Sequence, residues 1–233
     1  MNAPAKIIRL DEARVERAAI RAADGLATPD ELRLLEADAR QYGASWSALA
    51  RVEADKRAAL SLCAGLGMHV LLLHAVDAAG ACACGKLKCA NSNSRGKHPI
   101  ASAWQTAAFD FNKMDSALKA APQRYNLGWR MGEQLDGSML VCFDIDGPLS
   151  LLDPLESEFG KLPETLMATS GRGFHLFFRL AKTSAIPGNT KLCGVKEIDI
   201  RSVGGQVVIA PSRHYSGSFY KWVRCIEPAE IDL

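Results

Sequence analysis

The stretch SMLVCFDIDG, residues 138–147, sets an acidic pair into an apolar run and decides how the rest of the chain is interpreted. The run predicts a buried strand, in which successive side chains point to opposite faces. Asp144 and Asp146 then share one face, while Phe143 and Ile145 point into the other layer. Two carboxylates about 7 Å apart along a strand can reach a common pair of divalent cations. The same pattern also fits a strand end running into an Asp-Gly turn.

A glycine-rich turn precedes a second apolar run in SGRGFHLFFRL, residues 170–180. Ser170, Gly171 and Gly173 make a flexible turn whose backbone N–H groups could face a phosphate. In the strand that follows, His175 lies opposite the apolar face formed by Phe174, Leu176 and Phe178. An imidazole beside a glycine turn can donate to a phosphate oxygen, although a lone histidine in a strand is more often structural.

The third run is EIDIRSVGGQVVIAPSRH, residues 197–214. Ile198 and Ile200 are expected to face the core, so Asp199 and Arg201 face the other way together. The pair Gly204-Gly205 indicates a hairpin turn or a close approach to a ligand. Three such runs in succession favour a single site on neighbouring strands. Three carboxylates and an imidazole are the groups that metal-dependent nucleotide chemistry needs.

The composition is that of an ordinary globular protein, with 233 residues, 48% hydrophobic and 23% charged. No apolar run reaches the roughly 18 residues of a spanning helix, and the charged N-terminus lacks the apolar centre of a secretory signal. We therefore expect no membrane association and a cytoplasmic location. The net charge of +2 does not by itself indicate a nucleic-acid partner. The acid-free loop 86–98 could neutralise phosphates, or could be an ordinary solvated loop.

The period of the apolar residues divides the chain. Residues 1 to about 66 read as helical, with a start at Thr28 and a second helix from near Trp46 to Leu66. From Met68 the pattern becomes strand-like, with short helices expected at about 112–120 and 151–159 and a turn at 125–132. This order predicts an α/β or α+β domain built on a mixed sheet. Residues 1–45 are expected to form a helical extension or partner-docking arm.

Seven cysteines in a chain without an export signal argue against a disulfide framework. Four are isolated in apolar surroundings and are expected to be buried: Cys63, Cys142, Cys193 and Cys225. The other three cluster in a loop at about 79–99, where Cys82, Cys84, Cys89 and His98 could form a Cys₃His metal site. Reduced free thiols, or a His98 that serves the acidic site with Lys97, are the alternatives.

The order of these motifs resembles the prim-pol domain of the archaeo-eukaryotic primase superfamily. The shared order is D-x-D, S-G-x-G-x-H, I-D-x-R-x-x-G-G-x-x-V-x-x-P-S, and then a glycine and Y-x-W. The resemblance spans about Leu60 to Val223 and includes GKHP at 96–99 and NLGWRMG at 126–132. It implies an α+β fold, with a mixed-sheet catalytic core of the primase type, flanking helices and an N-terminal helical extension. The catalytic domain would cover residues 46–233.

The resemblance also implies roles for single residues. Asp144, Asp146 and Asp199 would hold two Mg²⁺ or Mn²⁺ ions, and His175 would contact the triphosphate of the incoming nucleotide. Arg172 stands where a smaller residue is frequent, and would add a phosphate contact or partly obstruct one. The further nucleotide contacts would be Lys97, Ser170, Gly171, Arg201, Ser212 and His214. Related proteins carry a similar cysteine-rich insertion, which implies structural Zn²⁺ at Cys82, Cys84, Cys89 and His98.

The implied function is that of a DNA primase/polymerase. Such an enzyme transfers nucleotides from NTPs or dNTPs onto a primer, directed by a single-stranded DNA template, during replication of a plasmid, phage or integrated element. A replicative helicase is a candidate partner, since bifunctional relatives continue into one. The alternatives are a replication-initiation or single-stranded nucleic-acid-binding module without catalysis, and a metal-dependent nuclease. The aromatic residues Trp104, Trp129, Tyr220 and Trp222 could stack on bases, but are more typical of core.

Overall fold

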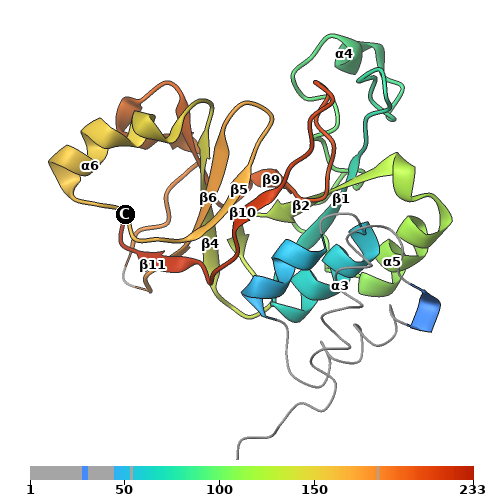
Figure 1. The fold of residues 1–233 in the computed structure, drawn as a ribbon, viewed down its shortest axis with the longest axis horizontal. Coiled ribbons are helices and arrows are strands. Elements are labelled where there is room, and N and C mark those ends of the chain that lie inside the picture. Colours follow the sequence, from blue (N-terminus) through green and yellow to red (C-terminus); the bar gives the residue numbers. More distant parts are fainter. Residues whose placement is uncertain (1–27, 31–44, 53–54, 183) are drawn as a thin grey trace, which may run out of the picture.

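The computed structural model describes residues 28–30, 45–52, 55–182 and 184–233. The helical extension expected at 1–45 lies almost entirely outside these residues and stays a prediction. The described chain combines two sheets with short helices (Figure 1). The α+β fold is therefore confirmed. In this part of the chain, no helix has the length and apolar character needed to cross a membrane.

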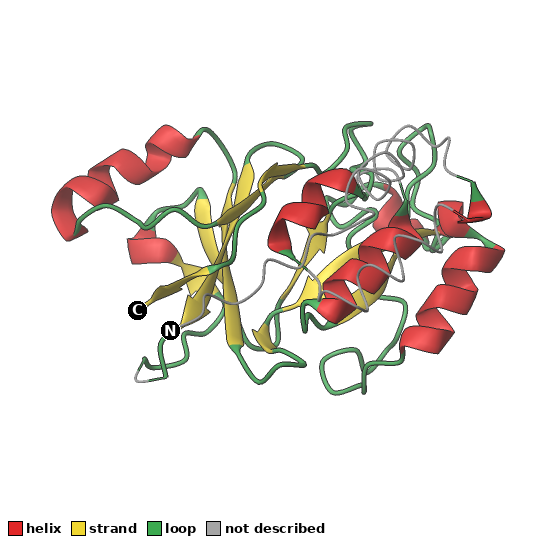
Figure 2. Cartoon of the chain, turned by 60° about the horizontal axis from the view of Figure 1, so that its bottom comes forward, coloured by secondary structure: helices red, strands yellow, loops and turns green. Residues whose placement is uncertain are grey.

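The longer helices pack on the outer surfaces of the sheets (Figures 1 and 2). Asp55 begins the helix that follows it, because its carboxylate accepts hydrogen bonds from the backbone N–H groups of Arg57 and Ala58. The single helix expected from Trp46 to Leu66 is therefore two helices, the first of them a short 3₁₀ helix. The described helices are η1 (Trp46–Arg51), α3 (Lys56–Gly65), α4 (Leu87–Ala90), α5 (Phe111–Ala120), η2 (Pro122–Arg124), η3 (Leu149–Leu152), α6 (Asp153–Phe159) and η4 (Leu192–Gly194).

The smaller sheet has three antiparallel strands in the order β1-β2-β9. Their ranges are β1 (Val70–His74), β2 (Tyr125–Arg130) and β9 (Gln206–Ile209). The larger sheet runs β10-β5-β6-β4-β8-β7, and β3 pairs with β4. The added strand β11 runs parallel to β6, which makes this sheet mixed. The ranges are β3 (Gly132–Glu133), β4 (Met139–Ile145), β5 (Leu166–Thr169), β6 (Phe174–Leu180), β7 (Thr190–Lys191), β8 (Ile198–Arg201), β10 (Trp222–Arg224) and β11 (Ala229–Ile231).

Two glycine-based predictions are corrected by the sheets. The expected turn at 125–132 is largely strand β2, which lies between β1 and β9. Gly128 permits the close packing there, since a Cβ on it would come within 2.8 Å of the Val207 carbonyl oxygen. The pair Gly204-Gly205 does not close a hairpin, because β8 and β9 belong to different sheets. Gly128 thus meets a packing demand, whereas Gly204 has a φ of +79° in a tight turn in which the Gly205 N–H donates to the Ser202 carbonyl.

Two hydrophobic cores lie on the two faces of the larger sheet. One core receives the side chains expected to face away from the acids, among them Phe143, Ile145 and Ile200, and it lies on the side of α6 (Figures 1 and 2). The other core joins the opposite face to the smaller sheet and α3. Trp129 of β2 links the two sheets, with its ring centroid 5.0 Å from that of Phe177. The predicted alternation of strands β4, β6 and β8 is therefore confirmed.

The isolated cysteines differ from one another. Cys63 and Cys142 are buried as expected, and Cys225 is half-buried. Cys193 is exposed, so the expectation that it fills a core is wrong. It lies in the short helix η4 with a positive φ of 47°, outside any strand, and apolar neighbours in sequence did not bring it inside.

Candidate active site

A row of polar side chains crosses the larger sheet. In the register of the strands, Asp144 of β4 lies opposite His175 of β6 on one side and Asp199 of β8 on the other. Lys191 of β7 lies opposite Asp199 and extends the row. Directly opposed residues share a face of a sheet, so these four side chains project from the same surface. Strand pairing thus brings together residues that are up to 55 positions apart in the sequence.

Each carboxylate of the site is held by a basic side chain. His175 Nε2 lies 3.3 Å from Asp144 Oδ1, and Arg201 Nη2 lies 3.2 Å from Asp144 Oδ2. The same Arg201 nitrogen is 2.9 Å from Asp199 Oδ2, while Lys191 Nζ is 2.6 Å from Asp199 Oδ1. Arg201 can reach both acids because it lies two residues after Asp199 on the same face of β8.

Asp146 continues the acidic face beyond the end of β4. Its carboxylate is half-exposed, and the guanidinium of Arg172 lies 2.9 Å from Oδ2. Arg172 comes from the glycine turn that precedes β6, so this ion pair ties the turn to the acids. Because both side chains are largely in solvent, the pair adds little to stability and can open at low cost.

Electrostatics keeps Asp144 ionised. Burial opposes its charge, but the hydrogen bond and charge of His175 and the nearby guanidinium of Arg201 outweigh it and hold the pKa of Asp144 below its usual range. An ionised carboxylate only accepts hydrogen bonds and is a good ligand for a hard cation. Asp144 is therefore in the protonation state that metal binding requires.

A cavity of about 420 Å³ opens over this row. It brings together most of the residues expected at the site from sequence: Lys97, Asp144, Asp146, Ser170, Gly171, Arg172, His175, Arg201 and His214. Asp199 is not in its lining and contacts it through Arg201. Acids and bases alternate around the cavity, so it presents cationic groups for an anionic ligand beside carboxylates for a cation.

Glycine is required twice in the turn at residues 170–173. A Cβ on Gly173 would lie 1.9 Å from the carbonyl oxygen of Ile145, so this glycine lets β6 approach the end of β4. A Cβ on Gly171 would lie 2.3 Å from His214 Nε2, so this glycine makes room for the imidazole. Ser170 closes the turn, since its hydroxyl accepts a hydrogen bond from the Gly173 N–H.

His214 presents a neutral imidazole to the cavity. Its Nδ1 accepts a hydrogen bond from the backbone N–H of Ser216, so the ring proton resides on Nε2 beside Gly171. Burial, and then the positive charges of Lys97, Arg172 and Arg95, lower the pKa of His214 to about 4. At neutral pH this residue is a hydrogen-bond donor without a charge.

Among the predicted nucleotide contacts, Ser212 is the one that does not line the cavity. It is fully buried. Its hydroxyl accepts a hydrogen bond from the Leu127 N–H and donates one to the Leu127 carbonyl. The motif position next to Pro211 thus fastens the end of β9 to β2, and a nucleotide contact by Ser212 is not available in this arrangement.

Several residues around the site were not singled out from the sequence. Lys191 and Gln206 are the main ones, and each is placed by long-range packing. Tyr220 was considered from the sequence as a core residue or a base-stacking aromatic, without a place beside the two histidines. Tyr220 lies between the two histidines, with ring centroids 5.8 Å from His175 and 6.0 Å from His214. Its place in the Y-x-W motif was the available signal. Burial, with Asp144 nearby, raises the pKa of Tyr220, so its hydroxyl stays protonated.

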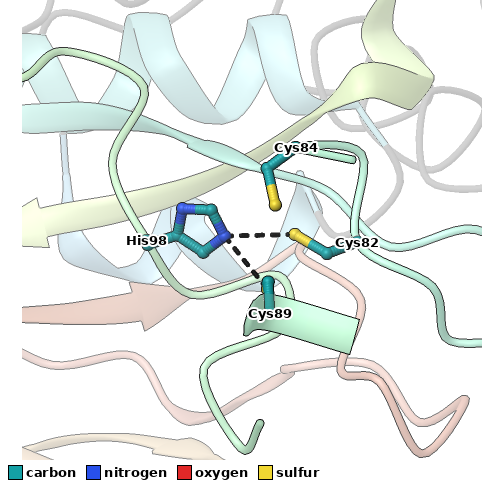
Figure 3. A group of neighbouring side chains, drawn as sticks. All are labelled: Cys82, Cys84, Cys89 and His98. Carbon is teal, nitrogen blue, oxygen red and sulfur yellow. Dashed lines mark hydrogen bonds between the residues drawn. The ribbon is translucent and has the colours of Figure 1, made fainter. Parts of the chain in front are cut away.

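The cysteine cluster converges on His98 (Figure 3). The ligand atoms of Cys82, Cys84, Cys89 and His98 all lie within 4.8 Å of one another, and His98 Nε2 is 3.2 Å from the sulfur of Cys82. Burial and then the charge of Lys86 lower the pKa of His98, which favours the neutral imidazole that binds metals. Three thiols and one imidazole at this spacing fit tetrahedral Zn²⁺.

The three acids have the ligand atoms that divalent cations prefer, but their carboxylates do not form a compact cluster. Carboxylate oxygens are the preferred ligands of Mg²⁺ and Mn²⁺, and Asp144 and Asp146 face one cavity. Among the described residues, the compact group of potential metal ligands is the cysteine cluster. The three acids are instead paired with Arg172, Arg201 and Lys191. A metal ion bound at the acids would therefore replace these basic side chains as the partner of the carboxylates.

The fold thus gathers acids, bases and a glycine turn around one cavity. The family model Prim-Pol, described as "Bifunctional DNA primase/polymerase, N-terminal", matches residues 59–232, well over half of the chain. The chain belongs to this family, and the resemblance seen in its motifs is confirmed. Its function is of the primase/polymerase type, which entails binding of nucleotides and nucleic acid. None of the curated proteins compared matches the chain.

Proposed function

We propose that this chain is a template-directed nucleotidyltransferase that extends or starts primers on single-stranded DNA, using NTPs or dNTPs. The observation that carries the proposal is the row His175, Asp144, Asp199 across three strands, with Asp146 and the glycine turn at the same cavity. Carboxylates for metals and donors for a triphosphate are both needed for phosphoryl transfer, and here they meet in one place.

Asp144, Asp146 and Asp199 are the proposed ligands of two Mg²⁺ or Mn²⁺ ions. These ions, when bound, supply activation of the primer 3′-hydroxyl and charge stabilisation of the leaving pyrophosphate. In the reaction, the 3′-oxygen bonds to the α-phosphorus while the bond to pyrophosphate breaks. The ionised carboxylate that this role requires of Asp144 agrees with its depressed pKa.

The triphosphate is the proposed ligand of the donors around the cavity. His175 and His214 would offer N–H groups, and the turn at 170–173 its backbone. Lys97, Arg172 and Arg201 would offer positive charge, and the two arginines would exchange a carboxylate for a phosphate when metal is bound. The cysteine cluster is proposed to hold a structural Zn²⁺.

The remaining details extend the same proposal. The partners would be a template strand, a primer and a replicative helicase, in the replication of a plasmid, phage or integrated element. The catalytic domain would cover residues 46–233 in a cytoplasmic protein. The packing of Leu49 of η1 into the core of the smaller sheet supports a domain start before the family match begins.

Primer extension with labelled nucleotides and Mn²⁺ tests the proposal. The double variant Asp144→Asn/Asp146→Asn should lower incorporation by at least about a hundredfold, since it removes two metal ligands and keeps the side-chain shapes. The matched control is Asp153→Asn, an exposed acid on α6 away from the cavity, which should extend primers like the unchanged chain. Undiminished incorporation by the double variant would sink the assignment of the acids.

The same assay separates the alternatives. A binding module without catalysis would shift DNA in a gel and incorporate nothing. A metal-dependent nuclease would degrade DNA without added nucleotides. Either result for the unchanged chain contradicts the proposal, whereas incorporation with a primer and without one would distinguish extension from de novo priming.

A further inference from the structure

The loop that carries the cysteine cluster also forms a wall of the cavity. Asn93, Ser94, Lys97, His98 and Pro99 all line it. His98 therefore belongs to two structures at once, the metal cluster through Nε2 and the cavity wall through its position in the chain. Lys97, the preceding residue, is one peptide bond away from a metal ligand.

Lys97 lines the same cavity as Asp144 and Asp146. Its side chain is half-buried, and its Nζ lies 5.7 Å from the centre of the Tyr215 ring. Its backbone is held as well, since its carbonyl accepts a hydrogen bond from the side-chain amide of Gln206. The Gly96 carbonyl before it accepts one from Asn126 Nδ2 at 2.9 Å. These two bonds hold the backbone carbonyls of Gly96 and Lys97, and the cysteine cluster adjoins them at His98.

The tip of the loop has little of its own to hold it in place. Of residues 81–95, all of which the structure describes, only Cys89 is buried, and Leu87 at the start of α4 is 92% exposed. The helix α4 has four residues, too few to be stable alone. A loop without apolar packing takes its conformation from a cross-link, and here the cross-link is the cluster at His98.

The segment around Tyr215, which leads to β10, packs against the same loop. The Tyr215 hydroxyl donates to Asn93 Oδ1 at 3.1 Å, and the guanidinium of Arg95 lies 4.4 Å from the centre of the Tyr215 ring. A Cβ on Gly80 would lie 2.3 Å from the Tyr215 carbonyl oxygen, so the backbones are in direct contact. Figure 1 shows the loop around α4 beside the segment that leads to β10. That segment carries His214 and Tyr220.

We propose that the metal held by Cys82, Cys84, Cys89 and His98 positions Lys97, and thereby sets the affinity of the cavity for a nucleoside triphosphate. The inference rests on the proposed function of the cavity as a triphosphate site. It assigns the cluster a role in substrate binding, in addition to holding the loop. Lys97 is the positioning link, because it is the one basic cavity residue that lies on the metal loop next to a ligand.

The test compares two variants that break the link at different points. Cys84→Ser removes one thiol whose sulfur also accepts a hydrogen bond from the nearby Lys86 N–H, so it disturbs the rest of the fold little. Lys97→Ala removes the charge and leaves the four ligands intact. Cys193→Ser is the matched control, an exposed cysteine outside the cluster. Each protein is assayed for zinc content, thermal unfolding and binding of a non-hydrolysable dNTP analogue in Mg²⁺.

We expect Cys84→Ser to lose zinc and to bind the analogue about tenfold or more weakly, the size of one charge-assisted contact. Lys97→Ala should lose a similar factor in affinity and keep its zinc. The double variant should bind about as weakly as Lys97→Ala alone, because the metal acts through that residue. Cys193→Ser should match the unchanged chain in all three measurements.

The result that overturns the inference is a Cys84→Ser protein that has lost its zinc, yet binds the analogue within about twofold of the unchanged chain. Additive losses in the double variant would also overturn it, because they would mean that the metal does not act through Lys97. If the unchanged chain binds no analogue at all, the proposed function fails and the inference falls with it.

Gly96→Ala keeps the inference testable should Cys84→Ser unfold. Gly96 has a φ of +72°, and a Cβ there would lie 2.9 Å from Val76 Cγ1, so alanine must shift the backbone next to Lys97. All four metal ligands remain. Zinc should be retained while the analogue binds about tenfold more weakly. Full affinity in this variant would show that the position of Lys97 does not matter.

Discussion

Position 171 requires glycine, because the imidazole of His214 occupies the space that a side chain would fill. We predict that Gly171→Ala displaces the imidazole, whose Nε2 would lie 2.3 Å from the new Cβ, and weakens binding of a dNTP analogue by about tenfold. The control is Gly188→Ala, at a surface position where a Cβ meets nothing within 4 Å. Titration of the analogue by fluorescence or calorimetry measures both. Equal affinity in the two variants would remove His214 from the binding site.

The neutral state of His214 makes stability depend on pH. Its pKa falls from 6.5 to about 4 on folding, so below pH 6.5 the unfolded chain takes up a proton that the folded chain does not. The free energy of unfolding should therefore decrease as the pH falls from about 6.5 to about 4, by up to about 3 kcal/mol.

The variant His214→Gln isolates this contribution, because glutamine does not titrate. Urea unfolding at a series of pH values measures the difference between the two proteins. That difference should be constant above about pH 6.5 and should move in favour of His214→Gln below it. A difference that stays flat down to pH 4 would mean that His214 is not buried among positive charges.

Helix α3 shows how one side chain sets the boundary of an element. The Asp55 carboxylate accepts hydrogen bonds from Arg57 N and Ala58 N. Asp55→Ala should reduce the free energy of unfolding by about 1 kcal/mol, measured by urea titration. Ser45→Ala, at the start of η1 where the side chain makes no capping bond, should cost less than about 0.5 kcal/mol. Equal losses would show that the Asp55 bonds do not hold the helix.

The elements differ in how far local sequence predicts them. Helix α5 and strands β4, β6 and β8 follow from apolar periodicity and lie where they were expected. Strand β2 was expected as a turn, because Gly128 resembles a turn residue until its neighbours β1 and β9 are known. The break between η1 and α3 comes from Asp55, whose side chain begins α3. The spacing of the apolar residues does not reveal this break. The two-residue strands β3 and β7 are defined by their pairing with β4 and β8, so no local pattern predicts them.

The two sheets are joined through aromatic packing, so we predict that they unfold as one cooperative unit. Phe177 is fully buried between Trp129 of the smaller sheet and Trp222 of the larger one, with ring centroids 5.0 and 5.9 Å away. Phe177→Ala should lower the free energy of unfolding by about 3–5 kcal/mol. The exposed Phe159 provides a control, since Phe159→Ala should change stability by less than about 0.5 kcal/mol.

Unfolding followed by tryptophan fluorescence and by far-ultraviolet circular dichroism should give coincident transitions in the Phe177→Ala protein. Two separate transitions would mean that the sheets unfold independently. The position of the cavity gives this coupling a functional consequence. Lys97 and Gln206 come from the side of the smaller sheet, while Asp144 and His175 belong to the larger one. The site exists only while the two sheets stay packed.

Sequence alone determined which residues share a face, because strand side chains alternate with a period of two regardless of what the strand packs against. It thereby identified Asp144, Asp146, His175 and Asp199, and the order of the motifs identified the family. Tertiary structure decided which strands are neighbours, and hence that Asp144 lies between His175 and Asp199. It also buried Ser212 against Leu127 and brought the loop of the cysteine cluster to the cavity through Lys97. These outcomes depend on register and on packing between distant segments, which no local pattern encodes.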